Sequence, residues 1–199
     1  MTRIPHFSRN LRLRIPTLET DHLVIREYVL DDLDNRHQLL AEAFGDNGSL
    51  DATFSWLDWT IRNYGELATL YQPPYGDRAV VLKSSGEAIG SVGLTPSVVP
   101  WNLLENGETD PIYTSPEFGL FYGILPTYWG NGYAREAIQP IIDYTFASLN
   151  AKRIVATTEH DNANSQRVME KLGMRLLKNT TGQHEWCQVV GVLNNPKLR

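Results

Sequence analysis

The stretch LPTYWGNGYAREA, residues 125–137, decides the fold of this chain. Two glycines flank Asn131, and helix-forming residues follow Gly132 directly. Asn-Gly often marks a hairpin turn, but no second strand pattern follows it here. The preceding segment EFGLFYGIL (117–125) predicts a strand, and apolar residues at helical spacing predict a helix from Tyr133 to about Leu149. The stretch is therefore a glycine-bearing turn from a strand into a helix.

Such a turn can bind an anion. Backbone N–H groups in the first turn of a helix have no helical partner, and the helix dipole adds partial positive charge there. Gly130 and Gly132 carry no side chain that would keep a phosphate from the backbone. A plain strand-to-helix turn explains the local pattern equally well, because the lysine of a phosphate loop and the third glycine of a dinucleotide fingerprint are both missing.

The rest of the chain alternates strand and helix patterns without a repeat or a linker. We therefore expect one α/β (α+β) domain over residues 19–199, preceded by a basic, loosely ordered N-terminal arm at 1–18. Further strands are predicted at 22–29, 78–83, 88–96, 152–159, 174–179 and 184–193, and helices at 31–44, within 50–72, and at 161–173.

The composition argues against several classes of partner. The net charge is -5 and no dense run of lysine and arginine occurs, so we expect no nucleic acid partner. No stretch approaches the ~20 apolar residues of a membrane span, so we expect no membrane association. Cys187 is the one cysteine, which excludes an intrachain disulfide and favours a reducing compartment, the cytoplasm. We also expect no metal site.

Two motifs together resemble the GNAT acetyltransferase superfamily, and most of all its ribosomal-protein alanine N-acetyltransferase branch. The acetyl-CoA signature of that superfamily, Gln/Arg-x-x-Gly-x-Gly/Ala, is similar to Trp129-x-x-Gly132-x-Ala134 within YWGNGYAREA. The second motif, Asn-x-x-Ser followed by EKLGF, is similar to NANSQRVMEKLGM, which begins at Asn162 and contains Ser165. The resemblance spans about residues 19–193.

This resemblance implies a mixed, mostly antiparallel twisted sheet flanked by helices. The sheet would splay between the strands at about 117–125 and 152–158, and the thioester of acetyl-CoA would lie in the splay. Amides of the glycine-bearing turn would bind the pyrophosphate, and the strand before it would pair with the pantetheine arm. Asn162 would bind the same arm, although helix capping explains it too. The residues so assigned to acetyl-CoA are Tyr122, Ile124, Trp129, Gly130, Asn131, Gly132, Tyr133, Ala134, Arg135 and Asn162.

Two residues are assigned to catalysis. Family members often carry an acidic base near position 119, which is Gly119 here, and Glu117 lies two residues earlier on the same sheet face. Glu117 is the predicted base, with a solvent-exposed glutamate at a strand start as the alternative. Many members donate a proton to the leaving thiolate from a tyrosine at the position of Met169. Ser165 is the predicted donor here, and a helix-capping role is its alternative.

The acceptor implied by the resemblance is a primary amine, either a protein N-terminal α-amine or a small-molecule amine. An α-amine has a pKa of about 7.7–8.0 and a lysine about 10.4, so an α-amine needs only a modest base. The alternative from another class is a non-catalytic CoA-binding or regulatory protein with the same fold. We expect a monomer or a homodimer.

Overall fold

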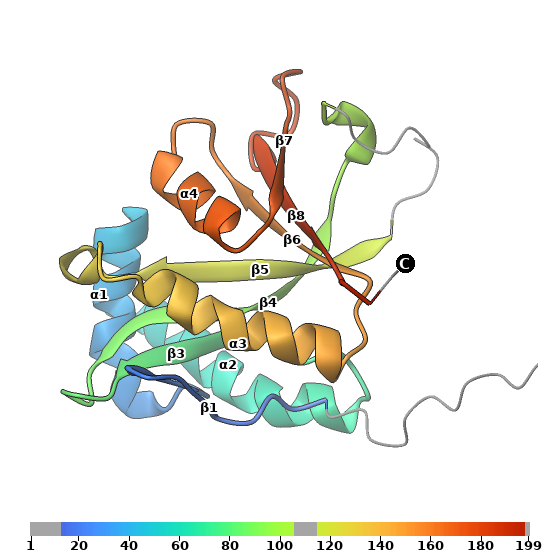
Figure 1. The fold of residues 1–199 in the computed structure, drawn as a ribbon. Helices are drawn as coiled ribbons and strands as arrows, with labels where there is room; N and C mark the ends of the chain where they lie inside the picture. The colour runs from blue at the N-terminus through green and yellow to red at the C-terminus, as the bar shows by residue number, and fades with distance from the viewer. Residues whose placement is uncertain (1–12, 106–114, 198–199) are drawn as a thin grey trace, which may run out of the picture.

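The computed structural model describes residues 13–105 and 115–197. Within these ranges the strands form an 8-stranded sheet in the order β1-β2-β3-β4-β5-β6-β8-β7 (Figure 1). Neighbouring strands are antiparallel except β5 and β6, which are parallel. The strands are β1 (Leu18–Glu19), β2 (Leu23–Arg26), β3 (Gly76–Leu82), β4 (Ala88–Val98), β5 (Pro116–Ile124), β6 (Arg153–Thr158), β7 (Arg175–Lys178) and β8 (Val189–Asn194).

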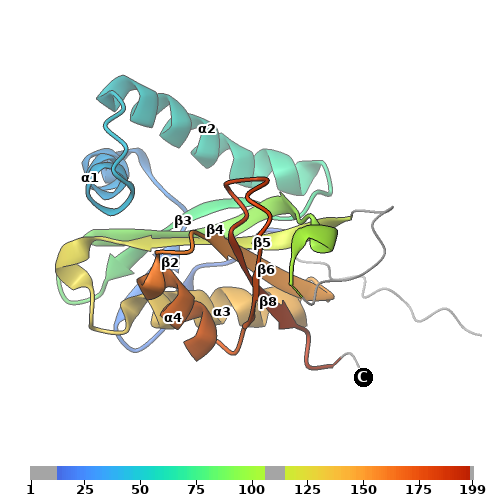
Figure 2. The same cartoon turned by 90° about the horizontal axis from the view of Figure 1, so that it is seen from above.

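Helices cover both faces of this sheet, with α1 and α2 on one side and α3 and α4 on the other (Figure 2). The architecture is the mixed, mostly antiparallel α/β sheet that the sequence predicts. The helices are α1 (Leu33–Phe44), α2 (Leu50–Thr69), α3 (Tyr133–Ala147) and α4 (Ala163–Lys171), with short 3-10 turns η1 (Leu30–Asp32), η2 (Trp101–Leu103) and η3 (Pro126–Tyr128).

The main core lies between α3 and the sheet. Ile138 and Ile141 of α3 and Ile154 of β6 are completely buried there, as the helical and strand patterns predict. Burying one such side chain stabilises a fold by about 1.5–3 kcal/mol, so this face holds α3 firmly in place. Because α3 connects the two parallel strands β5 and β6, its position determines where its N-terminus meets the edge of β5.

The strands β5 and β6 separate after a short paired segment. They pair at Phe118 with Ile154 and at Gly119 with Val155, although β5 runs on to Ile124 and β6 to Thr158. The expected splay is therefore present, and we use that name for β5 beyond Gly119 and β6 beyond Val155. The splay opens toward the turn that leads into α3.

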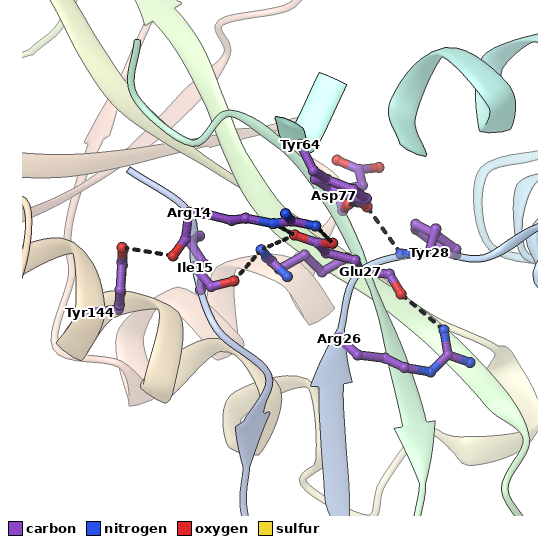
Figure 3. Close-up of polar contacts among 9 residues, drawn as sticks. Arg14, Ile15, Arg26, Glu27, Tyr28, Tyr64, Asp77 and Tyr144 are labelled. Atoms are coloured by element: carbon purple, nitrogen blue, oxygen red, sulfur yellow. Dashed lines mark hydrogen bonds and ion pairs between the residues drawn. The ribbon is translucent and has the colours of Figure 1, made fainter. Parts of the chain in front are cut away.

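The described end of the predicted N-terminal arm, residues 13–17, packs against the domain. Ile15 is buried in the main core, and its carbonyl accepts a hydrogen bond of 2.6 Å from Arg78. Arg14 makes two hydrogen bonds to the carboxylate of Glu27, at 2.8 and 2.6 Å (Figure 3). These residues therefore belong to the folded domain, whereas residues 1–12 lie outside the described part.

Sequence analysis places the strand around Cys187 too early. β8 begins at Val189, and residues 184–188 form a turn that carries the thiol into a second apolar cluster, where it is fully buried. Burial raises the pKa of Cys187 to about 11, which leaves it a neutral packing residue at neutral pH. Among the described helices, none combines the length and the apolar character required to cross a bilayer.

Candidate active site

The turn between β5 and α3 has a backbone that requires glycine. Gly130 and Gly132 both have a φ of 82°, in the left-handed region, and Gly132 is the N-cap of α3. A Cβ atom at either position would meet no atom within 4 Å, so the space in front of both residues is open. Asn131 holds the turn by donating to the carbonyls of Tyr128 (3.0 Å) and Trp129 (3.3 Å). We call residues 129–132 the glycine turn.

The first turn of α3 continues this open surface. Its N–H groups, at Tyr133, Ala134 and Arg135, precede the first helical hydrogen bond, which Glu136 donates to the Gly132 carbonyl at 3.0 Å. Arg135 is exposed in this turn. Backbone donors and the helix dipole thus meet at the same place, which is the chemistry that a phosphate group requires.

Trp129 closes one side of the glycine turn. Its indole nitrogen donates a hydrogen bond of 2.7 Å to the carbonyl oxygen of Ile124, and the side chain stays 53% exposed. The Ile124 carbonyl is therefore already engaged by the protein. Of the two backbone groups of Ile124, only the N–H group can still pair with a pantetheine arm, and that pairing stays a prediction.

A side-chain contact crosses the splay from β5 to α4. The Tyr122 hydroxyl lies 2.7 Å from Ser165 Oγ and 3.2 Å from the Ser165 carbonyl oxygen. The Ser165 hydroxyl is not the cap of α4, because Asn162 holds that position and accepts from the Ser165 N–H at 3.0 Å. Of the alternatives drawn from the sequence, capping applies to Asn162 and not to Ser165.

This combination of a splayed parallel strand pair and a glycine turn at a helix N-terminus agrees with the matches to known proteins. Residues 22–175 match the family described as acetyltransferase (GNAT) domain. The chain belongs to the GNAT acetyltransferase family. It is accordingly an acetyltransferase enzyme.

Relatives in sequence and structure support the same assignment. An uncharacterized N-acetyltransferase of Bacillus subtilis, YoaA, is 28% identical over 169 residues, which are 80% of this chain and 83% of the relative. An acetyltransferase from Agrobacterium tumefaciens has a TM-score of 0.67 and 23% identity, with 93% of this chain and 98% of that chain covered.

Two further solved structures are similar in fold. A ribosomal-protein alanine acetyltransferase from Vibrio fischeri has a TM-score of 0.64 and 20% identity, covering 92% of this chain and 98% of that one. RimL, a ribosomal L7/L12 alpha-N-protein acetyltransferase in complex with coenzyme A, has a TM-score of 0.59 and 14% identity, covering 88% and 95%. At these identities the structures show the fold alone.

Glu117 of this GNAT enzyme lies in a buried ion pair. Its Oε1 accepts hydrogen bonds from Arg153 Nε (2.9 Å) and from the Arg153 terminal nitrogen (2.6 Å), and the guanidinium lies 4.2 Å from the centre of the Trp101 ring. Glu117 is only 7% exposed, so the alternative of a solvent-exposed glutamate is wrong. The structure does not bring Glu117 and Ser165 together, because Tyr122, which contacts Ser165, lies about 16 Å further along β5.

Two hydroxyl groups of β4 crowd the space in front of Gly119, where the resemblance to the family suggests an acid. A Cβ atom on Gly119 would collide with the hydroxyl oxygens of Thr95 and Ser97, which reach over it from β4. A larger side chain would require both hydroxyl groups to turn away and would lie close to the Thr95 carbonyl oxygen. The base role of Glu117 stays a prediction, and its contacts favour a structural role.

An aromatic wall lies on the α1 side of β5. The rings of Phe44 and Phe121 stack with their centres 5.4 Å apart, and the Phe44 ring occupies the space that a Cβ on Gly123 would need. Phe44 remains 46% exposed. The loop between β7 and β8 rises on this same side of the sheet (Figure 2).

The sequence analysis did not predict the aromatic wall of Phe44 and Phe121 or the contact of the Tyr122 side chain with Ser165. Strand alternation places Tyr122 and Ile124 on one face of β5 and Phe121 on the other, which the sequence can show. Which helix covers each face depends on the connections between elements. The local sequence pattern does not show which helix covers which face, so these two contacts could not be predicted from it.

Proposed function

We propose that the protein transfers the acetyl group of acetyl-CoA to a primary amine, preferably an α-amine at a protein N-terminus. The observation that carries this proposal is the glycine turn, which is open in front of the α3 N-terminus and adjoins the splay. The family supports acetyl transfer, and the coenzyme A complex of RimL supports the choice of donor.

Residues of the glycine turn and of the splay would hold acetyl-CoA. The backbone amides from Gly130 to Arg135 present a row of donors suited to a pyrophosphate, and no side chain at Gly130 or Gly132 obstructs it. The end of β5 with Tyr122 and Ile124 pairs with β4 on one edge but not with β6 on the other, and this second edge suits an extended arm that carries amide groups. Asn162 would contribute its side-chain N–H groups, because its oxygen already caps α4. When bound, acetyl-CoA supplies an activated acyl group.

The surroundings of β5 favour an amine that loses its proton easily. Gly119 provides no carboxylate, and the carboxylate of Glu117 is occupied by Arg153. A lysine amine would cost over ~3 kcal/mol more to deprotonate at neutral pH than an α-amine with a pKa of about 7.7–8.0. We infer that solvent water removes this proton, and that the acceptor is an α-amine or a small amine of similar pKa.

Compartment and assembly complete the proposal. The one cysteine, Cys187, is buried and needs no disulfide partner, which fits a reducing compartment such as the cytoplasm. We propose a monomeric or homodimeric enzyme that uses no metal and binds neither nucleic acid nor membrane.

A thiol-release assay tests the proposal. The protein is mixed with acetyl-CoA and one of three acceptors: a short peptide with a free N-terminus and no lysine, the same peptide with a blocked N-terminus and one lysine, or a small amine. We expect thiol release with the free N-terminus to exceed release with the blocked lysine peptide at neutral pH. Tight binding of CoA by calorimetry without release for any acceptor would instead support the non-catalytic alternative.

A further inference from the structure

The phenol of Tyr122 links the two sides of the splay. It reaches from β5 to the first turn of α4 and contacts two oxygens of the same residue, Ser165 Oγ at 2.7 Å and Ser165 O at 3.2 Å. Burial raises the pKa of the Tyr122 phenol, and the hydrogen bond to Ser165 opposes this shift only in part. The phenol therefore stays neutral and able to donate at physiological pH.

The ring of Tyr122 packs against the main core, but neither this packing nor helix capping requires the two hydroxyl groups. Asn162 caps α4, so the Ser165 hydroxyl has no capping task. The interior beneath this helix is filled by Met169, which is completely buried and whose sulfur would contact a Cβ placed on Gly191. Packing and capping thus leave the hydrogen bond between the two hydroxyl groups unexplained.

The proton of Tyr122 can be placed in two ways. If it points to the Ser165 carbonyl, the phenol oxygen accepts from Ser165 Oγ, and the serine proton is used up inside the pair. If it points to Ser165 Oγ, the serine proton is available to a third group. A negative charge that develops next to Ser165 favours the second arrangement, because the serine proton then turns toward it.

We propose that Tyr122 is a positioning residue for acetyl transfer: its phenol donates a hydrogen bond to Ser165 Oγ, which directs the Ser165 proton toward the sulfur of the leaving thiol. The inference rests on the proposed function. It gives Tyr122 a side-chain role beyond the backbone pairing expected of β5, and it makes Ser165 active as one half of a pair.

The pKa values of the serine hydroxyl and the leaving thiol decide whether the serine proton is transferred completely. The lone pair of the amine forms the new C–N bond, the amine proton passes to solvent, and the C–S bond breaks with its electron pair remaining on sulfur. A thiol has a pKa of about 8.5, whereas an alcohol is close to water, at about 15.7. Complete transfer from Ser165 is therefore unfavourable, and the pair acts by hydrogen bonding to the sulfur, which takes its proton from solvent afterwards.

Kinetics of four variants test this arrangement. We expect Tyr122→Phe and Ser165→Ala each to lower kcat roughly 10-fold to 100-fold, the range for a hydrogen bond to a charged group. The KM for acetyl-CoA should change less than about twofold, because the contact gains strength only as sulfur becomes charged. The double variant should be no slower than Ser165→Ala alone. Tyr144→Phe, which removes another buried tyrosine hydroxyl, bonded to the Arg14 carbonyl at 3.4 Å, is the matched control and should keep its kcat.

A binding measurement provides a readout apart from turnover. Calorimetry at pH 8 compares CoA with desulfo-CoA, which lacks the sulfur. The wild type should prefer CoA, because the Ser165 proton stabilises its thiolate, and both Tyr122→Phe and Ser165→Ala should lose this preference to the same extent.

The outcomes separate this inference from the proposed function. A wild-type protein that releases no thiol with any amine would refute acetyl transfer, while the CoA preference would still test the pair. An active wild type with an unchanged kcat and an unchanged CoA preference in Tyr122→Phe would overturn the inference. Losses that multiply in the double variant would also overturn it, because they would show that the two hydroxyls act independently.

Discussion

Replacing Glu117 by glutamine separates a structural role of this residue from a catalytic one. Glu117 and Arg153 are 7% and 9% exposed at their side chains, and both hydrogen bonds from the guanidinium end on one carboxylate oxygen. Glutamine keeps the shape and one oxygen but removes the charge. The guanidinium of Arg153, which also lies over the Trp101 ring, would then lose its ionic contact with residue 117.

The size of the effect follows from this burial. Breaking a buried ion pair by removing one partner costs about 3–5 kcal/mol, and glutamine should fall at the low end because it still accepts a hydrogen bond. A loss of about 3 kcal/mol corresponds to a fall in Tm of roughly 6–12 °C for a chain of this size. If Glu117 only supports the sheet beside the splay, turnover below the new Tm should fall less than about tenfold.

The assay pairs a melting curve with thiol release at a temperature where both proteins are folded. Asp58→Asn is the matched control, because Asp58 pairs with Arg62 across one exposed turn of α2 at 3.0 Å and should contribute about 0.3–0.5 kcal/mol. A Glu117→Gln protein with an unchanged Tm and turnover reduced by about 10²–10⁴-fold would refute the structural reading and identify Glu117 as the base.

Three further predictions concern other parts of the molecule. Gly132→Ala should weaken acetyl-CoA binding by more than tenfold in calorimetry, because alanine disfavours the left-handed backbone of the glycine turn; Gly86→Ala, at another left-handed turn, should lose some stability but keep its affinity. Burial raises the pKa of Glu136, but hydrogen bonds from the turn between β1 and β2, which includes His22, lower it by more. The pKa of Glu136 in the folded protein therefore lies below 4.5. The stabilisation from Glu136 is therefore present above pH 4.5 and lost as the pH falls through the folded-state pKa, and Glu136→Gln should flatten this acid limb of Tm against pH. We propose that the aromatic wall of Phe44 and Phe121 lines the acceptor site, because Phe44 is 46% exposed on the face of β5 opposite to Tyr122. Phe44→Ala should then raise the KM for the amine several-fold and leave the KM for acetyl-CoA unchanged, and an equal rise in both would show that the wall does not face the acceptor.

The regular elements could be read from local patterns. The hairpin of β3 and β4, the strand β5 and the helices α1, α3 and α4 appear within a few residues of their predicted positions, because each shows the periodicity of its own secondary structure. The prediction failed around Cys187, where apolar residues suggested a strand. There the side chains are buried by a turn that folds over the sheet, and burial alone does not distinguish the two.

The candidate site divides in the same way. The glycine turn was predictable, because a left-handed backbone and an open helix N-terminus are properties of a few consecutive residues. Contacts between residues that are distant in the sequence were not predictable. The link between Glu117 and Arg153 spans 36 positions and that between Tyr122 and Ser165 spans 43, and each depends on how β5, β6 and α4 lie against one another.

The sequence by itself therefore determined the order of the elements, the glycine turn and the acetyltransferase family, since all three rest on short-range patterns and on motifs in a given order. The tertiary structure alone decided which hydroxyl contacts Ser165, which cation pairs with Glu117 and which side chains crowd Gly119. Each of these depends on strand register and on the direction of a side chain across the sheet. A shift of one residue in that register would reverse every face.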